Sequence, residues 1–239
     1  MSIKYYIKKN CRLCDSKDLE LVLKLNPSPL CDDYVKNKKE QDTFPLNLYL
    51  CRKCGFVQID CVIDPSEIYK DYLYITKSSL GLQNHFSNYV KSVISRLNLN
   101  SNSLVVDIGS NDATLLRCFK ECHMRVLGVE PAFEIANQAT LSGIQTHAEY
   151  FDELLVEKIL KESGPADIVT ANNVFANIDN LSVLTKAMVK LLSNNGVIII
   201  ESSYLQDMIN NYVFDFIYHE HLSYLSILPL KRFFSNYNM

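Results

Sequence analysis

Two Cys-x-x-Cys pairs restrict the fold of this chain more than any other feature. They are "CRLC" at residues 11–14 and "CRKC" at 51–54, and 36 residues separate them. Thiolates at this spacing are typical zinc ligands, and two pairs fill all four positions of a tetrahedral ion. The sequence therefore predicts a structural zinc site, with Gly55 forming the tight turn after the second pair. Its predicted ligands are Cys11, Cys14, Cys51 and Cys54.

The competing interpretation is a set of buried free cysteines, which pack as small apolar side chains. Two matched pairs make it the weaker interpretation.

The N-terminal "MSIKYYIKKN" lacks the apolar core of a signal peptide. No apolar run approaches the roughly 18 residues of a membrane span. We expect a cytoplasmic protein, in which the eight cysteines stay reduced.

Composition and net charge restrict the classes of partner that this chain can bind. The chain has 239 residues, 48% of them hydrophobic, which is enough for one large domain or two small ones. Its net charge of −3 provides no basic surface for nucleic acid or for an anionic membrane. We therefore expect neither nucleic acid nor membrane as a partner.

After residue 103, short β-branched runs alternate with helical patterns. The runs are "LVVDIG" from residue 104, "RVLGVE" from 125, "IQTH" from 144, "ADIVTA" from 166 and "GVIIIE" from 196. Helical patterns begin near Ala113, Ala132, Asp152 and Asp179. Parallel strands need such crossover connections. The sequence predicts an α/β fold, a doubly wound (Rossmann-like) sheet preceded by a small zinc-binding domain.

The chain divides into three predicted parts. Residues 1–77 hold the cysteine pairs and form the zinc-binding domain. Residues 78–100 place apolar side chains at helical spacing, which predicts a connecting helix with Ser78 or Ser79 as its N-cap. Residues 101–239 form the doubly wound domain.

A turn for binding a nucleoside follows the first predicted strand. In "LVVDIGSNDA", Asp107 ends the strand, and Gly109 lets the backbone approach a ligand closely. Glu130 ends the next strand, where it can accept hydrogen bonds from ribose hydroxyls. Because the Gly-x-Gly-x-x-Gly motif of dinucleotide enzymes is absent, S-adenosylmethionine fits better. The alternative is a turn that only supports the fold. The candidate cofactor residues here are Asp107, Gly109, Ser110, Asn111, Asp112, Glu130 and Pro131.

The segment "IYHEHLSYLS" at 217–226 concentrates ionisable side chains between apolar ones. Burying such groups is costly unless they are paired or neutral. As a metal site, His219 and His221 would share one face of a strand, but no third ligand is evident nearby. As a structural element, they would be half-exposed polar residues at the edge of a loop.

Five motifs in order carry a family resemblance. They are the cysteine pairs with "CGFVQ" (54–58), "DYLYIT" (71–76), "DIGSND" (107–112), "NNVFANI" (172–178) and "IYHEHLSYLS". With them the chain resembles the zinc-containing, S-adenosylmethionine-dependent sugar C-methyltransferases. These enzymes act on nucleotide-linked 4-keto deoxysugars. The resemblance covers nearly the whole chain.

The resemblance implies a role for the histidine cluster. In this family the second histidine of "YHEH" looks like the base that removes a proton from the carbon next to the ketone. The resemblance assigns this role to His221. Tyr218, Glu220 and Tyr74 match residues that line the sugar pocket, and Asn172 matches a cofactor residue. An imidazole titrates near neutral pH, and hydrogen-bond donors stabilise the enolate. The implied partner is a nucleotide-linked sugar.

The chain departs from the family pattern at three places. Asn177, still a candidate catalytic residue, replaces a histidine and cannot carry a proton near pH 7. Ala113 replaces a glycine, so cofactor binding weakens if that residue needs a positive φ. The family continues beyond residue 239 with two strands and another domain, so we expect a C-terminally truncated enzyme whose methyltransferase domain is incomplete. The alternative function is a non-catalytic, zinc-stabilised relic that binds ligand without turnover.

Overall fold

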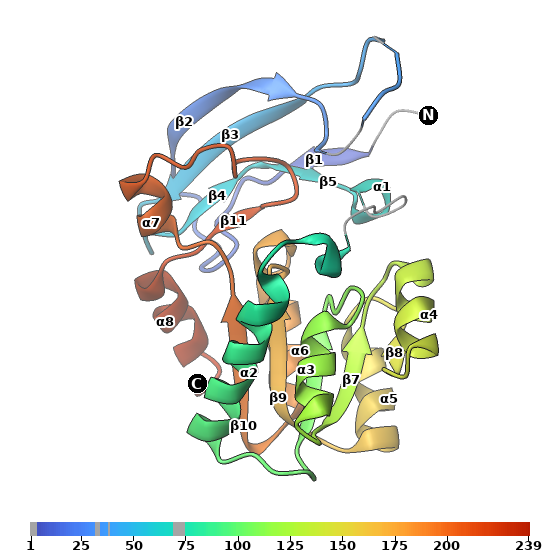
Figure 1. The fold of residues 1–239 in the computed structure, drawn as a ribbon. Coiled ribbons are helices and arrows are strands. Elements are labelled where there is room, and N and C mark those ends of the chain that lie inside the picture. The colour runs from blue at the N-terminus through green and yellow to red at the C-terminus, as the bar shows by residue number, and fades with distance from the viewer. Residues whose placement is uncertain (1–3, 32–33, 38, 69–74) are drawn as a thin grey trace. The chain divides into compact units, whose positions relative to one another are not determined.

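The computed structural model describes residues 4–31, 34–37, 39–68 and 75–239. Its contacts divide the chain into two units (Figure 1). The first, here called the cysteine unit, comprises residues 1–71, 175–182 and 202–239. The second, here called the sheet unit, comprises residues 72–174 and 183–201.

A five-stranded parallel sheet forms the centre of the sheet unit, as the sequence predicts. The strands are β6 (Leu104–Ile108), β7 (Arg125–Val129), β8 (Thr146–His147), β9 (Ala166–Asn172) and β10 (Leu192–Glu201). Their order is β10-β9-β6-β7-β8, and every neighbouring pair is parallel. The order reverses next to β6, and ligands of doubly wound sheets bind at the carboxyl ends of strands at such a point.

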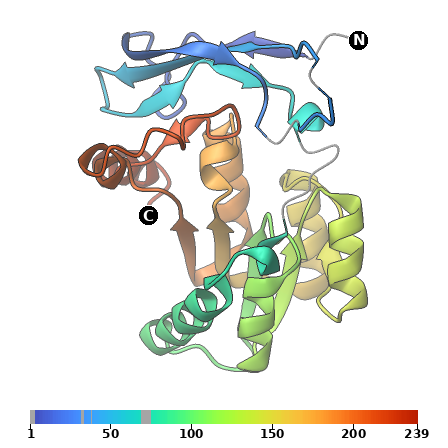
Figure 2. The ribbon, with the colours of Figure 1, turned by 45° about the horizontal axis from the view of Figure 1, so that its top comes forward.

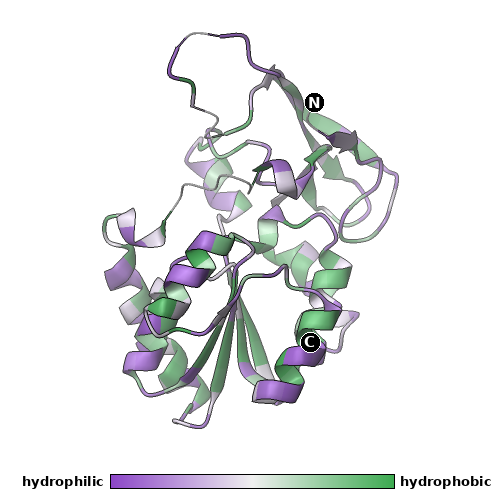
Figure 3. Ribbon diagram, turned by 90° about the vertical axis from the view of Figure 1, so that its right-hand side faces the viewer, coloured by the Kyte–Doolittle hydropathy of each residue, from purple (hydrophilic) through white to green (hydrophobic). Residues whose placement is uncertain are grey.

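Helices cover both faces of this sheet. They are α2 (Leu82–Leu97), α3 (Thr114–Glu121), α4 (Phe133–Leu141), α5 (Glu153–Ser163) and α6 (Leu181–Leu191). In Figure 1, α2 and α3 lie in front of the sheet and α6 lies behind it. The central strands β6 and β9 are apolar and mostly buried (Figure 3), because helices cover this part of the sheet on both faces.

The predicted connecting helix, α2, belongs to the sheet unit. Its Phe86 and Val90 are buried in one cluster with Leu116 and Phe119 of α3. The predicted N-cap is wrong. The cap residue is Gly81, at φ 84°, and no side chain caps the helix. Ser78 lies instead in the short 3₁₀ turn η1 (Thr76–Ser78), where its hydroxyl donates to the Ile75 carbonyl at 2.6 Å.

Two antiparallel sheets build the cysteine unit. Strands β1 (Tyr5–Ile7) and β5 (Cys61–Ile63) form one sheet. The other has the order β11 (Ser223–Tyr224), β4 (Val57–Ile59), β3 (Phe44–Cys51) and β2 (Leu19–Ser28). Figure 2 shows the blue and cyan strands of this unit edge to edge. Its short helices are α1 (Pro65–Ile68), η2 (Phe175–Asn177), α7 (Leu205–Asn210) and α8 (Ile227–Ser235).

The C-terminal segment is part of the cysteine unit rather than of the parallel sheet. Strand β11 pairs with β4, with Ser223 opposite Gln58 and Tyr224 opposite Val57. Leu222 and Tyr224 are buried in one cluster with residues of β3 and β4. This grouping of residues 202–239 differs from the division expected at residue 101, because pairing between strands distant in sequence leaves no local signal.

Within the described ranges, every helix is too short or too polar to cross a membrane.

Candidate functional site

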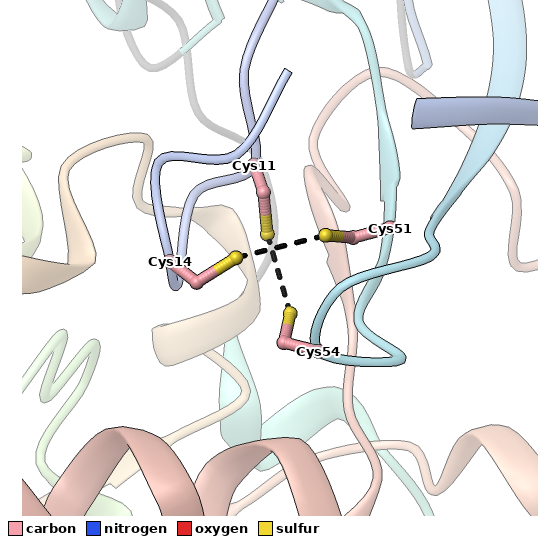
Figure 4. Close-up of side chains that lie close together, drawn as sticks. All are labelled: Cys11, Cys14, Cys51 and Cys54. Atoms are coloured by element: carbon pink, nitrogen blue, oxygen red, sulfur yellow. Dashed lines mark hydrogen bonds between the residues drawn. The ribbon is translucent and has the colours of Figure 1, made fainter. Parts of the chain in front are cut away.

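The four cysteines predicted to bind zinc converge in the cysteine unit (Figure 4). Their Sγ atoms all lie within 4.8 Å of one another. The Cys11–Cys54 and Cys14–Cys51 sulfur pairs are each 3.6 Å apart. A tetrahedral zinc ion with Zn–S bonds of about 2.3 Å places its ligands about 3.8 Å apart. The sulfur positions therefore fit one zinc ion.

Both cysteine pairs lie on turns of the same design. The backbone N–H of the first cysteine, Cys11 or Cys51, donates to the carbonyl five residues later at 2.8 Å. Each turn then needs a left-handed residue, which is Asp15 at φ 59° in one and Gly55 at φ 80° in the other. Glycine adopts this conformation without strain. The turn predicted at Gly55 is therefore present.

The chemistry of the four sulfur atoms also fits a metal. Burial raises the pKa of the Cys11 thiol to about 12 and also raises that of Cys54. Thiols in such surroundings lose their protons when a cation compensates their charge. With four sulfur ligands the ion has no open position, so its role is structural.

His221 lies in the turn that precedes β11. Its Nδ1 is 3.0 Å from the Phe216 carbonyl oxygen, and its Nε2 is 2.9 Å from the Tyr218 hydroxyl. Because a carbonyl only accepts, we assign the proton of the neutral imidazole to Nδ1, which leaves a lone pair on Nε2. Burial lowers the pKa of His221 from its ordinary 6.5, although the bond to Phe216 raises it. His221 is therefore a neutral base at pH 7.

His219 has different surroundings from His221. It is 1% exposed, its Nε2 is 3.1 Å from the Pro45 carbonyl oxygen, and its ring meets Phe44 edge-on. The two histidines lie in a turn rather than on one face of a strand. In the described part of the chain, the four cysteines are the only cluster able to hold a metal. The interpretation of this segment as a metal site therefore has no support. His219 instead packs against Phe44 and Pro45.

Asn177 ends η2, in a segment held by the start of the chain. Two residues later, Asp179 accepts from Arg12 Nε at 2.9 Å and from Lys8 Nζ at 3.0 Å. The Arg12 side chain is fully buried, and its Nη1 donates to the Ile59 carbonyl at 2.6 Å. Removing one partner of a buried ion pair typically costs about 3–5 kcal/mol. Since Arg12 follows the ligand Cys11, the zinc turn and the Asn177 segment are directly linked.

The predicted cofactor turn joins β6 to α3 in the sheet unit. Gly109 has a φ of 68°, and a Cβ there would overlap the Val174 side chain. Glycine is thus required for both conformation and space. Ala113 also has a positive φ, 62°. The family's glycine is therefore replaced at a position that needs left-handed backbone, and weaker cofactor binding remains a prediction.

Three buried carboxylates surround this turn. Asp107, Asp112 and Glu130 are 4%, 8% and 6% exposed. Within the described residues, no ion pair involves any of them. Glu130 accepts from the backbone N–H groups of Ala132 and Asn111 at 2.9 and 3.0 Å, and each of its oxygens keeps a lone pair. A bound cation would stabilise the charged form of these buried carboxyl groups, so the turn favours a cationic ligand.

Asp107 is the most deeply buried of these carboxylates. The sheet register places it opposite Thr170 of β9, whose hydroxyl donates to it at 2.6 Å. Burial raises the pKa of Asp107 to about 7, and the neighbouring Glu130 adds to the shift, while Thr170 opposes it. The Thr170 hydroxyl, in an otherwise apolar strand, therefore holds the Asp107 carboxyl in place at the turn.

The stability of the sheet unit is expected to depend on this carboxyl. Its pKa is about 7 in the folded chain against the ordinary value of 3.8 for an aspartate, so the folded state binds more protons between these values. Without cofactor, stability should fall as pH rises through that window, by up to about 4 kcal/mol. Asp107→Asn, which can still accept from Thr170, should remove this fall. Urea unfolding followed by circular dichroism at both ends of the window tests it, and an unchanged pH slope in Asp107→Asn would contradict it.

Comparison with known families identifies the chain. Residues 11–69 match the family described as "Putative zinc binding domain", and residues 82–239 match the family described as "Methyltransferase domain". The second match spans more than half of the chain. The chain belongs to this methyltransferase-domain family.

This methyltransferase is similar to one curated protein in sequence and to several solved structures in fold. C-methyltransferase NovU of Streptomyces niveus is 29% identical over 232 residues, which cover 96% of this chain and 55% of NovU. The chain thus spans about half the length of that relative. The plantazolicin methyltransferase BpumL, in complex with a triazolic analogue and SAH, has a TM-score of 0.50 at 15% identity, covering 64% of each chain. A chain from the complex between the Haloferax volcanii Trm112 methyltransferase activator and "the putative methyltransferase" has a TM-score of 0.51 at 14% identity, covering 65% of this chain and 70% of that one. The structural likenesses show a shared fold.

Both predicted cofactors of this methyltransferase are supported. The zinc-binding match covers the cysteine cluster, and the methyltransferase match covers the turn predicted to bind S-adenosylmethionine. Each expected group of residues fits its cofactor: four sulfur atoms for zinc, and an acidic turn with a glycine at close approach for a sulfonium compound.

Apart from the four cysteines and Asn177, the predicted site residues that the structure describes fall into two groups. Tyr218 and His221 are in direct contact in the cysteine unit, with Glu220 between them in sequence. The cofactor candidates gather at the carboxyl ends of β6, β7 and β9, where Pro131 follows Glu130 and Asn172 is the last residue of β9. Tyr74 lies outside the described residues.

Sequence reasoning missed several residues that support these groups. Thr170 orients Asp107, and the Phe216 carbonyl sets the tautomer of His221. Arg12 and Asp179 hold the Asn177 segment. A hydroxyl inside the apolar run "ADIVTA" was a signal for Thr170, whereas a backbone carbonyl leaves none.

Proposed function

We propose that this methyltransferase transfers a methyl group from S-adenosylmethionine to a carbon of a nucleotide-linked keto deoxysugar, through an enolate formed by His221. The observation that carries the proposal is the state of His221, a neutral imidazole with its lone pair on Nε2 beside a tyrosine hydroxyl. The likeness to a C-methyltransferase over 96% of the chain supports a carbon as the acceptor.

His221 has the features of a general base. Its Nδ1–H is fixed by the Phe216 carbonyl, so Nε2 is the atom that takes a proton. In the proposed step, Nε2 removes a proton from the carbon next to the ketone, and the C–H electron pair forms the enolate. Bound S-adenosylmethionine would supply the methyl group to the enolate carbon, and the electrons of its S–CH₃ bond would remain on the sulfur of S-adenosylhomocysteine. The proton on His221 passes to solvent.

Tyr218 suits the stabilisation of the enolate oxygen. Its hydroxyl lies 2.9 Å from His221 Nε2, close to where the proton is removed. A hydroxyl hydrogen rotates freely about its C–O bond. Once a substrate C–H group lies against His221 Nε2, the Tyr218 hydroxyl no longer donates to that nitrogen. It can then donate to the substrate oxygen on which negative charge develops. Glu220, Tyr74 and Asn177 remain proposed contacts of the sugar.

The cofactor turn favours S-adenosylmethionine on electrostatic grounds. Bound there, the cofactor supplies a methyl group on a positively charged sulfur. Three buried carboxyl groups without ion pairs among the described residues would stabilise that charge, and the cation would in turn favour the ionised form of Asp107. They would repel the pyrophosphate of a dinucleotide. Glu130 offers lone pairs for the two ribose hydroxyls, and Gly109 allows close approach to the backbone.

Glu130→Ala is expected to weaken cofactor binding by about 1.5–3 kcal/mol, the usual value of hydrogen bonds to a charged group. Titration calorimetry with S-adenosylhomocysteine measures it. Because two backbone N–H groups also lose their acceptor, thermal unfolding of the variant serves as the control for folding. Equal affinity in a folded variant would place the ribose elsewhere.

Methyl transfer itself tests the proposed function. The protein is incubated with S-adenosylmethionine carrying a ¹³C-methyl group and with a panel of nucleotide-linked 4-keto deoxysugars. We expect the label on the carbon next to the ketone, where NMR detects its coupling to the ring. Label on oxygen or nitrogen would contradict the proposal. Cofactor binding without any transfer would favour the non-catalytic relic.

A further inference from the structure

The two zinc turns carry an arginine at the same place, but its surroundings differ. Arg12 in the turn of residues 11–15 and Arg52 in the turn of residues 51–55 each follow the first cysteine. The Arg52 side chain is exposed and pairs with Glu20 at the surface, at 2.9 Å. The Arg12 side chain is fully buried. Because the second turn forms with an exposed arginine, the turn itself does not require a buried one. Burying a guanidinium is costly, so Arg12 must make contacts that compensate for it.

One edge of the Arg12 guanidinium holds the segment that contains Asn177. Its Nε donates to one carboxylate oxygen of Asp179 at 2.9 Å, and Lys8 Nζ donates to the other oxygen at 3.0 Å. The hydroxyl of Tyr6 donates to that second oxygen as well. Burial raises the pKa of Asp179, but the three donors lower it, and the net effect holds this pKa below its ordinary value. The carboxylate therefore stays ionised and fastens the Asn177 segment to the start of the chain.

Another branch of the same guanidinium holds the strand that pairs next to His221. Nη1 of Arg12 donates to the Ile59 carbonyl at 2.6 Å. The backbone N–H of Ile59 donates in turn to the carbonyl of Leu222, the residue after His221, at 3.1 Å. Gln58, fully buried on the same strand, accepts from the backbone N–H of Arg12 at 2.8 Å. The zinc turn is therefore joined to the His221 turn through β4.

We propose that Arg12 is a positioning residue, which fixes the places of His221 and Asn177 relative to each other. The proposal rests on the proposed function, in which His221 removes the proton and Asn177 contacts the sugar. A guanidinium is planar and presents its donors in fixed directions. Two segments bound to different N–H groups of one guanidinium therefore cannot move independently. The first zinc turn would then organise the substrate side of the site as well as the fold of its own unit.

Arg12→Lys tests the branch that leads to His221. Lysine keeps the positive charge beside Asp179, but it lacks the second arm of the fork, which reaches the Ile59 carbonyl. We expect kcat for methyl transfer to fall roughly tenfold to a hundredfold, because a displacement of about 1 Å from the reacting geometry can cost 10²-fold. KM for the sugar should stay the same, because the Asp179 contact remains.

Asp179→Asn tests the edge that leads to Asn177. The variant keeps the Arg12 contact to Ile59 and gives up the charge that anchors the Asn177 segment. We expect KM for the sugar to rise roughly twofold to tenfold, the range for one misplaced hydrogen bond, with kcat unchanged. The two variants should therefore divide the effects on kcat and KM between them. A residue that only stabilises the fold would not produce this division.

Arg52→Lys is the matched control, since it makes the same exchange at the exposed arginine of the other zinc turn. It should change neither kinetic constant.

The imidazole of His221 gives a measurement that needs no methyl transfer. The chain has five histidines, so labelling with ¹⁵N-histidine gives few signals, and their shifts report which ring nitrogen carries the proton. In the wild type we expect the His221 proton on Nδ1, where the Phe216 carbonyl holds it. In Arg12→Lys the shifts of the two ring nitrogens should move toward each other as that bond loosens. Arg52→Lys and Asp179→Asn should keep the wild-type shifts.

The outcomes are distinguishable. Wild-type His221 shifts together with wild-type kcat and KM in a folded Arg12→Lys would overturn the inference, and so would equal losses in Arg12→Lys and Arg52→Lys. If a single variant does not fold, the double variant Arg12→Gln/Asp179→Asn replaces it, because it removes both charges of the buried pair. That variant should show both kinetic effects and the shift change, and their absence would equally overturn the inference. A wild type that transfers no methyl group would contradict the proposed function, and the imidazole shifts would then decide the positioning role alone.

Discussion

Cys51→Ser is expected to abolish zinc binding and to unfold the cysteine unit while the sheet unit stays folded. A structural zinc site contributes an apparent binding free energy of about 10–16 kcal/mol to folding, and a serine hydroxyl is a poor replacement for a thiolate. The two hydrophobic clusters described in the cysteine unit each contain fewer buried residues than the cluster of α2 and α3 in the sheet unit, so they compensate for less of the loss. The parallel sheet has its own core.

Elemental analysis and hydrogen exchange resolved along the chain measure both effects. Backbone amides of β3, β4 and β11 should lose protection, whereas those of β6, β7 and β9 should keep it. Loss at β11 is the more demanding result, because it follows only from the pairing with β4. Cys122→Ser, in the sheet unit, is the matched control and should retain one zinc ion per chain. Full zinc content or unchanged protection in Cys51→Ser would contradict the assignment.

His221→Asn is expected to lower turnover by roughly 10²–10⁴-fold, the range for the loss of a general base. The amide of asparagine cannot accept a proton near pH 7. Cofactor affinity should be unchanged, because the proposed cofactor contacts belong to the sheet unit. Initial rates of methyl transfer and calorimetry with S-adenosylhomocysteine measure the two quantities.

His219→Asn is the matched control for that substitution. His219 is buried against Pro45 and Phe44, so its loss should lower the unfolding temperature while the folded fraction keeps its turnover. The two variants would then show that His219 contributes to packing and His221 to catalysis, although the two residues are only two positions apart. Equal turnover losses in both variants, each corrected for the folded fraction, would remove the special role of His221.

The parts of the structure that were predictable rest on local patterns. Ligand spacing within each Cys-x-x-Cys pair, and the left-handed turn at Gly55, follow from a few adjacent residues. The five strands of the parallel sheet were found because short β-branched runs alternate with helical patterns along this part of the chain. Asp152 caps α5 through its side chain at 2.9 Å, at the residue where the helical pattern begins.

The parts that escaped prediction depend on contacts between distant segments. Nothing near Ser223 indicates that it pairs with Gln58, so residues 202–239 were assigned with the parallel sheet. His219 and His221 have similar neighbours in sequence and differ only in what packs against them. The helical pattern of residues 78–100 does not indicate that the Tyr89 hydroxyl is buried beside Asn172.

Solvent deuterium exchange at the carbon next to the ketone tests enolate formation by His221 most directly. The sugar nucleotide is incubated in D₂O with the protein and S-adenosylhomocysteine, so that the proton can leave and return without methyl transfer. We expect the wild type to exchange this hydrogen and His221→Asn to exchange it only at the rate of buffer alone. Equally fast exchange in the two proteins would contradict the account, because the base would then lie elsewhere.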